Sequence, residues 1–223
     1  MKSLLFDSGP IISLTMNNLL WLLEPLKKRF RGEFYITEDV RAELVERPLR
    51  IKKFEFEAVQ VARVIGQGIL SIASSPDVTE LVRLANSCFK CRGTWLRIVQ
   101  PAEVEILALA KQYQTAAVVD ERTVRLLLEA PESLGGLLEK RLGCPAIMDE
   151  NNVKQFRNEL KDLHIIRSAE LVATAFRLGL FDEWIPNMKK GREILIDAVL
   201  WGVRSSGCAI TREEIDAIKA EVL

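Results

Sequence analysis

The chain has 223 residues, of which 48% are hydrophobic and 28% are charged, a composition that is ordinary for a folded, soluble protein. Its 31 basic and 31 acidic residues balance, which argues against general binding of nucleic acid, so any such contact has to be local, through a metal or a basic strip. No apolar run reaches the roughly 18 residues that a membrane span needs, and Asp7 interrupts the short apolar stretch at the N-terminus. We therefore expect a cytoplasmic protein with no membrane contact.

The first two thirds of the sequence alternate short apolar runs with amphipathic segments. The run at 3–7 (SLLFD) and the run at 116–120 (AAVVD) both end on an aspartate, as buried parallel strands often do at their polar boundary. Helices are expected between the runs, with Thr37 capping one and Pro101 starting another. The expected strands lie at residues 3–7, 34–36, 69–74 and 116–119. Strands that alternate with helices predict right-handed crossovers and a three-layer α/β/α sandwich around a parallel sheet.

The last third differs in pattern. Residues 144–148 are a candidate for one more strand, residues 149–152 are expected to form a turn, and everything after them is expected to be helical. We therefore divide the chain into a domain at 1–148 and a helical C-terminal extension at 149–223. The apolar faces of the extension need burial, either on the sandwich or in a homodimer. Those faces carry Leu171, Ala175, Phe176, Ile194, Ile196, Val199 and Leu200.

The cysteines and the single histidine give mainly negative information. The sequence holds one CxxC pair, Cys88 and Cys91, whereas a structural zinc site normally needs a second pair or histidines. Reduced thiols are the expectation for all four cysteines in a cytoplasmic protein. His164 lies far in sequence from any candidate nucleophile, and no GxSxG motif accompanies it, so serine hydrolase chemistry is disfavoured.

Acidic residues recur at predicted strand ends and helix starts. Asp7 and Asp120 follow two strands, and Glu43 lies in the helix after the second strand. Glu103 and Glu105 lie in the first turn of the helix that begins at Pro101. The carboxyl ends of parallel strands meet at one edge of a sheet, so we expect these acids to gather there. Such a cluster without histidine suits Mg²⁺ or Mn²⁺, which favour oxygen ligands and support phosphodiester hydrolysis.

The ordered segments LLFDSG, ITEDVRAELVE, PAEVEILALA and VVDERTVR resemble the PIN-domain family of nucleases, in particular its prokaryotic branch with a glutamate pair in the third motif. The resemblance covers about residues 3–130. It implies a central parallel sheet of four to five strands and a Mg²⁺- or Mn²⁺-dependent ribonuclease. It also implies a set of site residues. Asp7, Glu103 and Asp120 would hold the metal. Glu43 would be the second acid of the site, and Glu105 is the other candidate for the position of the third acid, which Glu103 fits best. Ser8 and Arg122 would contact the substrate.

Three functional hypotheses follow. The first is a metal-dependent endoribonuclease acting on RNA, with the toxin of a toxin–antitoxin pair, bound by an antitoxin protein, as one form of it. The second is a catalytically weak or inactive PIN-like scaffold that binds RNA or a protein, which the neutral charge favours. The third is another α/β protein whose carboxylates only cap helices and turns.

Overall fold

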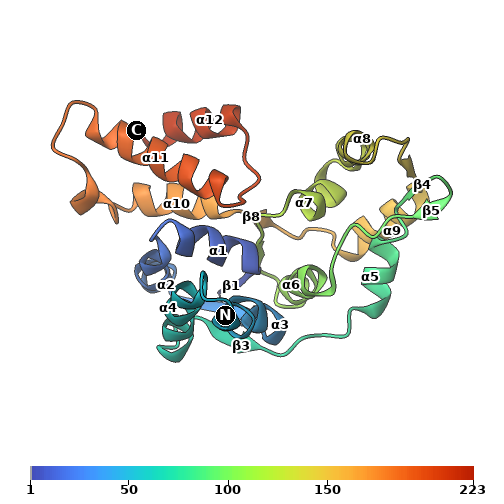
Figure 1. Cartoon of the computed structure of the whole chain (residues 1–223), viewed down its shortest axis with the longest axis horizontal. Helices are drawn as coiled ribbons and strands as arrows, with labels where there is room; N and C mark the ends of the chain where they lie inside the picture. Colours follow the sequence, from blue (N-terminus) through green and yellow to red (C-terminus); the bar gives the residue numbers. More distant parts are fainter. Residues whose placement is uncertain (1) are drawn as a thin grey trace.

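The computed structural model describes residues 2–223 and shows a central sheet of five parallel strands between layers of helices (Figure 1). This confirms the expected three-layer α/β/α architecture. In spatial order the strands are β3 (Ser71–Ala73), β2 (Glu33–Thr37), β1 (Ser3–Phe6), β6 (Ala116–Val118) and β8 (Ile165–Ile166). The central strand β1 is buried along its whole length and pairs with β2 and β6, which explains its unbroken apolar sequence.

Helices connect successive parallel strands of the central sheet and form two groups along the chain. The first group is α1 (Ser8–Met16), α2 (Leu23–Phe30), α3 (Glu38–Arg41) and α4 (Glu55–Gly66), with the short turns η1 (Leu20–Leu22), η2 (Ala42–Glu46) and η3 (Pro48–Arg50). The second group is α5 (Thr79–Ala85), α6 (Pro101–Gln112), α7 (Arg122–Glu129), α8 (Pro131–Leu142) and α9 (Glu150–Glu159). Helix α6 packs on β1, β2 and β6. Right-handed crossovers place the two groups on opposite faces of the sheet.

Residues 149–152 were expected to form a turn and the rest of the chain to be helical, and this expectation is wrong in two places. Helix α9 begins at Glu150, inside the expected turn. Ile165 and Ile166 form β8, which pairs in parallel with β6 and completes the central sheet. The segment then continues through α10 (Ser168–Arg177), η4 (Asp182–Trp184), α11 (Gly191–Ser205) and α12 (Arg212–Val222). No helix within residues 2–223 is both long and apolar enough to cross a membrane.

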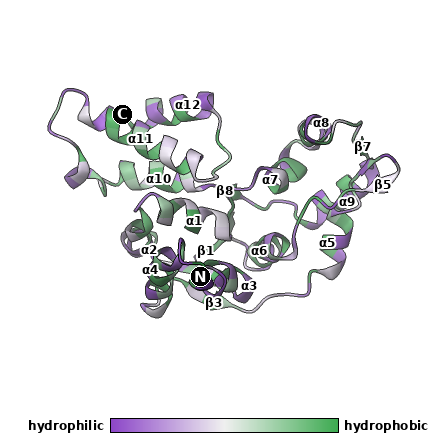
Figure 2. Ribbon diagram, viewed as in Figure 1, coloured by the Kyte–Doolittle hydropathy of each residue, from purple (hydrophilic) through white to green (hydrophobic). Residues whose placement is uncertain are grey.

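The apolar faces of the C-terminal helices are covered mainly by the chain itself. Helices α10 and α11 pack against α1, and Figure 2 shows hydrophobic residues along these helices. Phe176 and Leu200 are fully buried, whereas Ile194 is 46% exposed. Most of the surface that raised the question of a homodimer is therefore buried, partly against α1 and partly between the C-terminal helices themselves.

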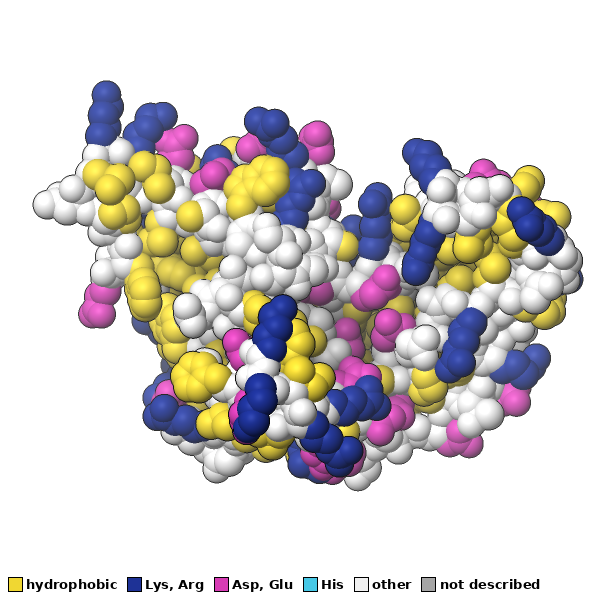
Figure 3. Space-filling view, in the orientation of Figure 1, with side chains coloured by type: hydrophobic (Ala, Val, Ile, Leu, Met, Phe, Trp, Pro, Cys, Tyr) yellow, Lys and Arg dark blue, Asp and Glu magenta, His cyan; other side chains and the backbone are white. Residues whose placement is uncertain are grey.

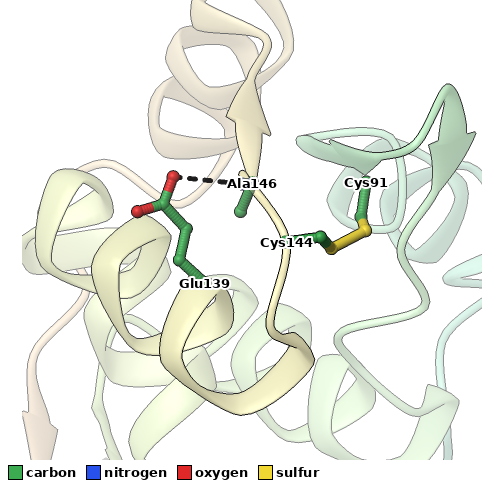
Figure 4. Close-up of a disulfide and its surroundings, with 4 residues drawn as sticks. All are labelled: Cys91, Glu139, Cys144 and Ala146. Carbon is green, nitrogen blue, oxygen red and sulfur yellow. Dashed lines mark hydrogen bonds between the residues drawn. A yellow bond between two sulfur atoms is a disulfide. The ribbon is translucent and has the colours of Figure 1, made fainter.

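A second, smaller sheet lies apart from the first. It joins β4 (Phe89–Cys91), β5 (Thr94–Trp95) and β7 (Ile147–Met148) in antiparallel order β5-β4-β7. The candidate strand at 144–148 therefore exists but belongs to this sheet. Cys91 and Cys144 form a disulfide beside it (Figure 4), which corrects the expectation of four reduced thiols. Cys88 and Cys208 are free and buried.

The disulfide joins residues that are 53 positions apart, so it should restrict the unfolded chain considerably. We expect the Cys144→Ser variant to lose about 2–4 kcal/mol of unfolding free energy, measured by urea unfolding under oxidising conditions. A reductant should destabilise the wild type to the same degree and leave the variant unchanged. An equal response of both proteins to the reductant would contradict a stabilising role for this bond.

Candidate functional site

Asp7 and Asp120 lie side by side at the carboxyl edge of the central sheet. Their strands, β1 and β6, are neighbours, and the backbone N–H of Asp7 donates to the carbonyl of Val118 at 3.0 Å. Gly9 lies between the two side chains. A Cβ at Gly9 would stand 3.4 Å from Cβ of Asp120 and 3.5 Å from Oδ2 of Asp7. The predicted juxtaposition of the two aspartates is therefore present.

Asp7 is buried and is the N-cap of α1. Its Oδ2 accepts a hydrogen bond from the backbone N–H of Gly9 at 3.4 Å, as an N-cap aspartate commonly does. The pKa of Asp7 is raised to about 6, mainly because the group is buried; the charges of Glu43 and Asp120 add to the shift, and the backbone N–H groups of Ser8 and Gly9 oppose it. Ser8 thus contributes its backbone N–H to the site.

Asp120 has a different environment, in which both carboxylate oxygens accept hydrogen bonds. Oδ1 accepts from the backbone N–H of Ser168 at 2.8 Å. Oδ2 accepts from the hydroxyls of Ser13 at 2.7 Å and Ser168 at 2.8 Å. The carbonyl of Asp120 accepts from the backbone N–H of Ala209 at 3.0 Å. Only 2% of Asp120 is exposed, so it is held firmly between α1, α10 and the loop before α12.

Glu103 and Glu43 complete the acidic cluster. Glu103 lies in the first turn of α6, where its Oε2 accepts from the backbone N–H of Gln100 at 2.8 Å. Burial raises the pKa of Glu103 to about 7, with additional contributions from the charges of Glu121, Asp7 and Glu43. Glu43 lies in η2, a π-helical turn of the kind found often at functional sites, and forms an ion pair with the exposed Arg47 at 3.1 Å.

Glu105 lies outside this cluster, although its helix is the same. Its Oε2 accepts from the hydroxyl of Ser75, beyond the end of β3, at 2.9 Å. Burial raises its pKa, and the nearby charge of Asp39 adds to the shift. The structure therefore groups Glu103, not Glu105, with Asp7. Arg122, the other expected substrate contact, is exposed at the first position of α7 and follows Glu121 directly.

Three residues of the site escaped the sequence interpretation. Ser13 and Ser168 hold Asp120 but lie 107 and 48 positions from it, so no local pattern connects them. Glu121 belongs to the VVDERT segment and could have been found, because it follows Asp120 directly. It caps α7 through the backbone N–H of Val124 and adds a charge close to Glu103.

The cluster consists of carboxylates, which are oxygen ligands for metals and whose negative charges repel one another. Figure 3 shows acidic side chains gathered in the hollow between the α10–α12 end and the α7–α8 end of the molecule. Within residues 2–223, no three His, Cys, Asp or Glu side chains already converge to the spacing of a metal site. The donor set nevertheless has the chemistry that a hard divalent cation prefers, because it consists of carboxylates.

Comparisons with known proteins do not assign the chain to a family. No protein-family model, curated protein or solved structure matches it. The resemblance to PIN domains therefore stays a prediction based on the residues quoted above.

The raised pKa of Asp7 predicts how stability depends on pH. The folded state binds the Asp7 proton more tightly than the unfolded state, so this group costs stability as the pH rises from about 4 to about 6. Asn also caps helices well. Asp7→Asn should therefore stabilise the protein at pH 8 by roughly 1–3 kcal/mol, and the gain should vanish near pH 4. Urea unfolding across this range tests it, with the exposed Glu159→Gln as control. A pH profile identical to that of the wild type would contradict the assigned burial.

Substitution of Asp120 should lower the free energy of unfolding, in contrast to Asp7→Asn. Asp120→Ala removes the acceptor of three hydrogen bonds and leaves the buried groups of Ser13 and Ser168 without partners. We expect a loss of about 2–4 kcal/mol in unfolding free energy. A change below about 0.5 kcal/mol would show that these contacts do not hold the C-terminal helices in place.

Proposed function

We propose that the protein is a metal-dependent endoribonuclease that hydrolyses RNA phosphodiester bonds at the cluster of Asp7, Glu43, Glu103 and Asp120. The observation that supports it best is the unfavourable charge state of two of these acids. Asp7 and Glu103 lie near other carboxylates, and neither takes part in the ion pairs formed within residues 2–223. A bound cation would relieve this repulsion, and an arrangement that lowers stability suggests a role in function.

Asp7, Glu103 and Asp120 are the residues that would hold Mg²⁺ or Mn²⁺. The cation would supply an activated water and neutralise the charge of the scissile phosphate. The hydrogen bonds from Ser13 and Ser168 fix the orientation of the Asp120 carboxylate. The backbone N–H groups at the start of α1 do the same for Asp7.

Other residues of the chain would serve the RNA itself. Glu43 is held only by the exposed Arg47, so its carboxylate is free to turn and accept a proton from the attacking water. Arg122, exposed at the start of α7, is suited to contact a phosphate of the substrate. The proposal also has three wider parts. The protein would act as a toxin that an antitoxin protein binds, it would form a homodimer, and it would be located in the cytoplasm.

One observation favours the second candidate, a PIN-like scaffold that binds RNA or a protein without cleaving it. Both oxygens of Asp120 are already engaged by donors, so metal binding has to compete with three hydrogen bonds. Calorimetric titration of Mn²⁺ into metal-free protein, repeated with an RNA oligomer present, separates the two candidates. Binding that is lost in Asp7→Asn/Glu103→Gln supports the nuclease, and no binding under either condition supports the scaffold.

Glu103 and Glu105 form a matched pair for testing cleavage. We expect Glu103→Gln to lower the Mn²⁺-dependent cleavage rate of single-stranded RNA by about 100-fold or more, because one of the carboxylates at the reaction centre is lost. Glu105→Gln should cleave at close to the wild-type rate, since Glu105 contacts Ser75 instead. The two rates are measured on labelled RNA by gel electrophoresis. Equal loss in both variants would mean that the helix, not the cluster, limits activity.

A further inference from the structure

The net charge of zero hides a local excess of positive charge. No Asp or Glu occurs between Glu80 and Glu103, although the chain as a whole is rich in both. The same is true of residues 140–148. Both stretches contain basic residues, so each is locally cationic.

The fold brings the two stretches together at the small antiparallel sheet. The β4–β5 hairpin lies in the first stretch and β7 in the second, and the disulfide between Cys91 and Cys144 ties them (Figure 4). We call the resulting group the hairpin cluster. It consists of Lys90, Arg92, Trp95, Arg97, Lys140 and Arg141.

Trp95 gives the cluster an aromatic centre. Its side chain is 41% exposed, and Lys90, its cross-strand partner, places Nζ 3.8 Å from the centre of the indole ring. This cation–π contact orients the indole on the sheet surface. The neighbouring Phe89 is fully buried beneath the same sheet, which anchors the hairpin. Lys90 covers one face of the indole, so the exposed remainder of the ring is the part open to a ligand.

The cations of the cluster differ from other surface cations in having no salt bridge. Within residues 2–223, none of the cluster's lysines or arginines forms one, whereas the exposed Lys52 and Arg83 are each paired with a glutamate. Figure 3 shows Lys and Arg side chains together with hydrophobic ones over the end of the molecule that carries α8 and β5. Unpaired charges of one sign favour a polyanionic partner.

Arg97 connects the hairpin cluster to the start of α6, where Glu103 lies. Arg97 donates through Nη2 to the side chain of Gln100 at 3.2 Å, and the backbone N–H of Gln100 donates to Glu103 at 2.8 Å. A chain bound along the hairpin would therefore reach the start of α6, where the acidic cluster begins.

We propose that the hairpin cluster binds single-stranded RNA and guides it toward the acidic site. RNA is named as the polyanion because this inference rests on the proposed nuclease function. Trp95 stacks on a base, and the surrounding cations contact phosphates. Single strands are favoured over duplexes because an unpaired base can present its face to the indole. An acidic protein segment would use the cations but would gain nothing comparable from the indole.

The test measures the affinity of a labelled single-stranded RNA by fluorescence anisotropy, in an Asp7→Asn background that should prevent cleavage. Trp95→Ala should weaken binding by about tenfold at every salt concentration, because stacking is lost. Arg92→Ala/Arg97→Ala should weaken it at low salt and reduce its salt dependence by about one to two phosphate contacts. Matched controls are Trp184→Ala, which removes another exposed tryptophan, and Lys52→Ala/Lys53→Ala; both should bind like the parent. Thermal unfolding confirms that each variant is folded.

Unchanged affinity in both hairpin variants would overturn the proposal. So would equal weakening for a duplex of the same length, or tighter binding of a polyglutamate peptide than of RNA. The outcome is separable from that of the nuclease proposal. If the hairpin variants lose RNA binding but the wild-type protein never cleaves RNA, the binding surface stands and the nuclease fails. The hairpin substitutions are also made in the wild-type background to measure cleavage. If they change neither binding nor cleavage while Glu103→Gln is inactive, the nuclease proposal stands and the binding surface fails.

Discussion

The hydrogen bonds of the Asp120 carboxylate hold the C-terminal helices to the sheet. Ser13 reaches it from α1 and Ser168 from α10, so one buried side chain joins three elements that are distant in sequence. The carbonyl of the same residue also holds Ala209 in the loop before α12. Because unpaired buried donors are costly, the position of α10 and the direction of the chain leaving β8 both depend on this acceptor.

The two aspartates at the sheet edge therefore have different physical roles. Asp120 has its charge compensated by donors, whereas Asp7 is buried with weaker compensation beside Glu43 and Glu103. A cluster of this kind has an energetic preference for protons or cations, and the chain keeps its acids close together at one edge of the sheet instead of dispersing them. Structural and functional roles are thus divided between residues of the same type at neighbouring strand ends, and burial alone does not distinguish them.

The sheet and its edge could be predicted because they follow from local patterns. Apolar runs that end on Asp7 and Asp120 specify buried parallel strands, and strand alternation specifies the layers. The two-residue strand β8 has too few residues for any periodicity, and the pairing of Cys91 with Cys144 depends on contacts across 53 positions. The resemblance favours Glu103 as the third acid and leaves Glu105 as the other candidate. Residues two apart on a helix point about 200° from each other, so only one of them can face the cluster.

The net charge of the whole chain gives little information about binding, because it is the sum of locally positive and locally negative regions. The basic strips that stand out in sequence, at 27–31 and 50–53, are partly neutralised: Lys27 pairs with Glu33, Lys28 with Glu24 and Lys52 with Glu55. The acid-free stretch around the β4–β5 hairpin has fewer basic residues in a row, and its Arg83 pairs with Glu80, but the cations of the hairpin cluster form no salt bridge within residues 2–223. Whether a charged segment can attract a polyanion depends on the carboxylates that the fold brings to it, and only the three-dimensional arrangement specifies those. A neutral chain can therefore combine a cationic surface with an acidic centre, which a nuclease requires.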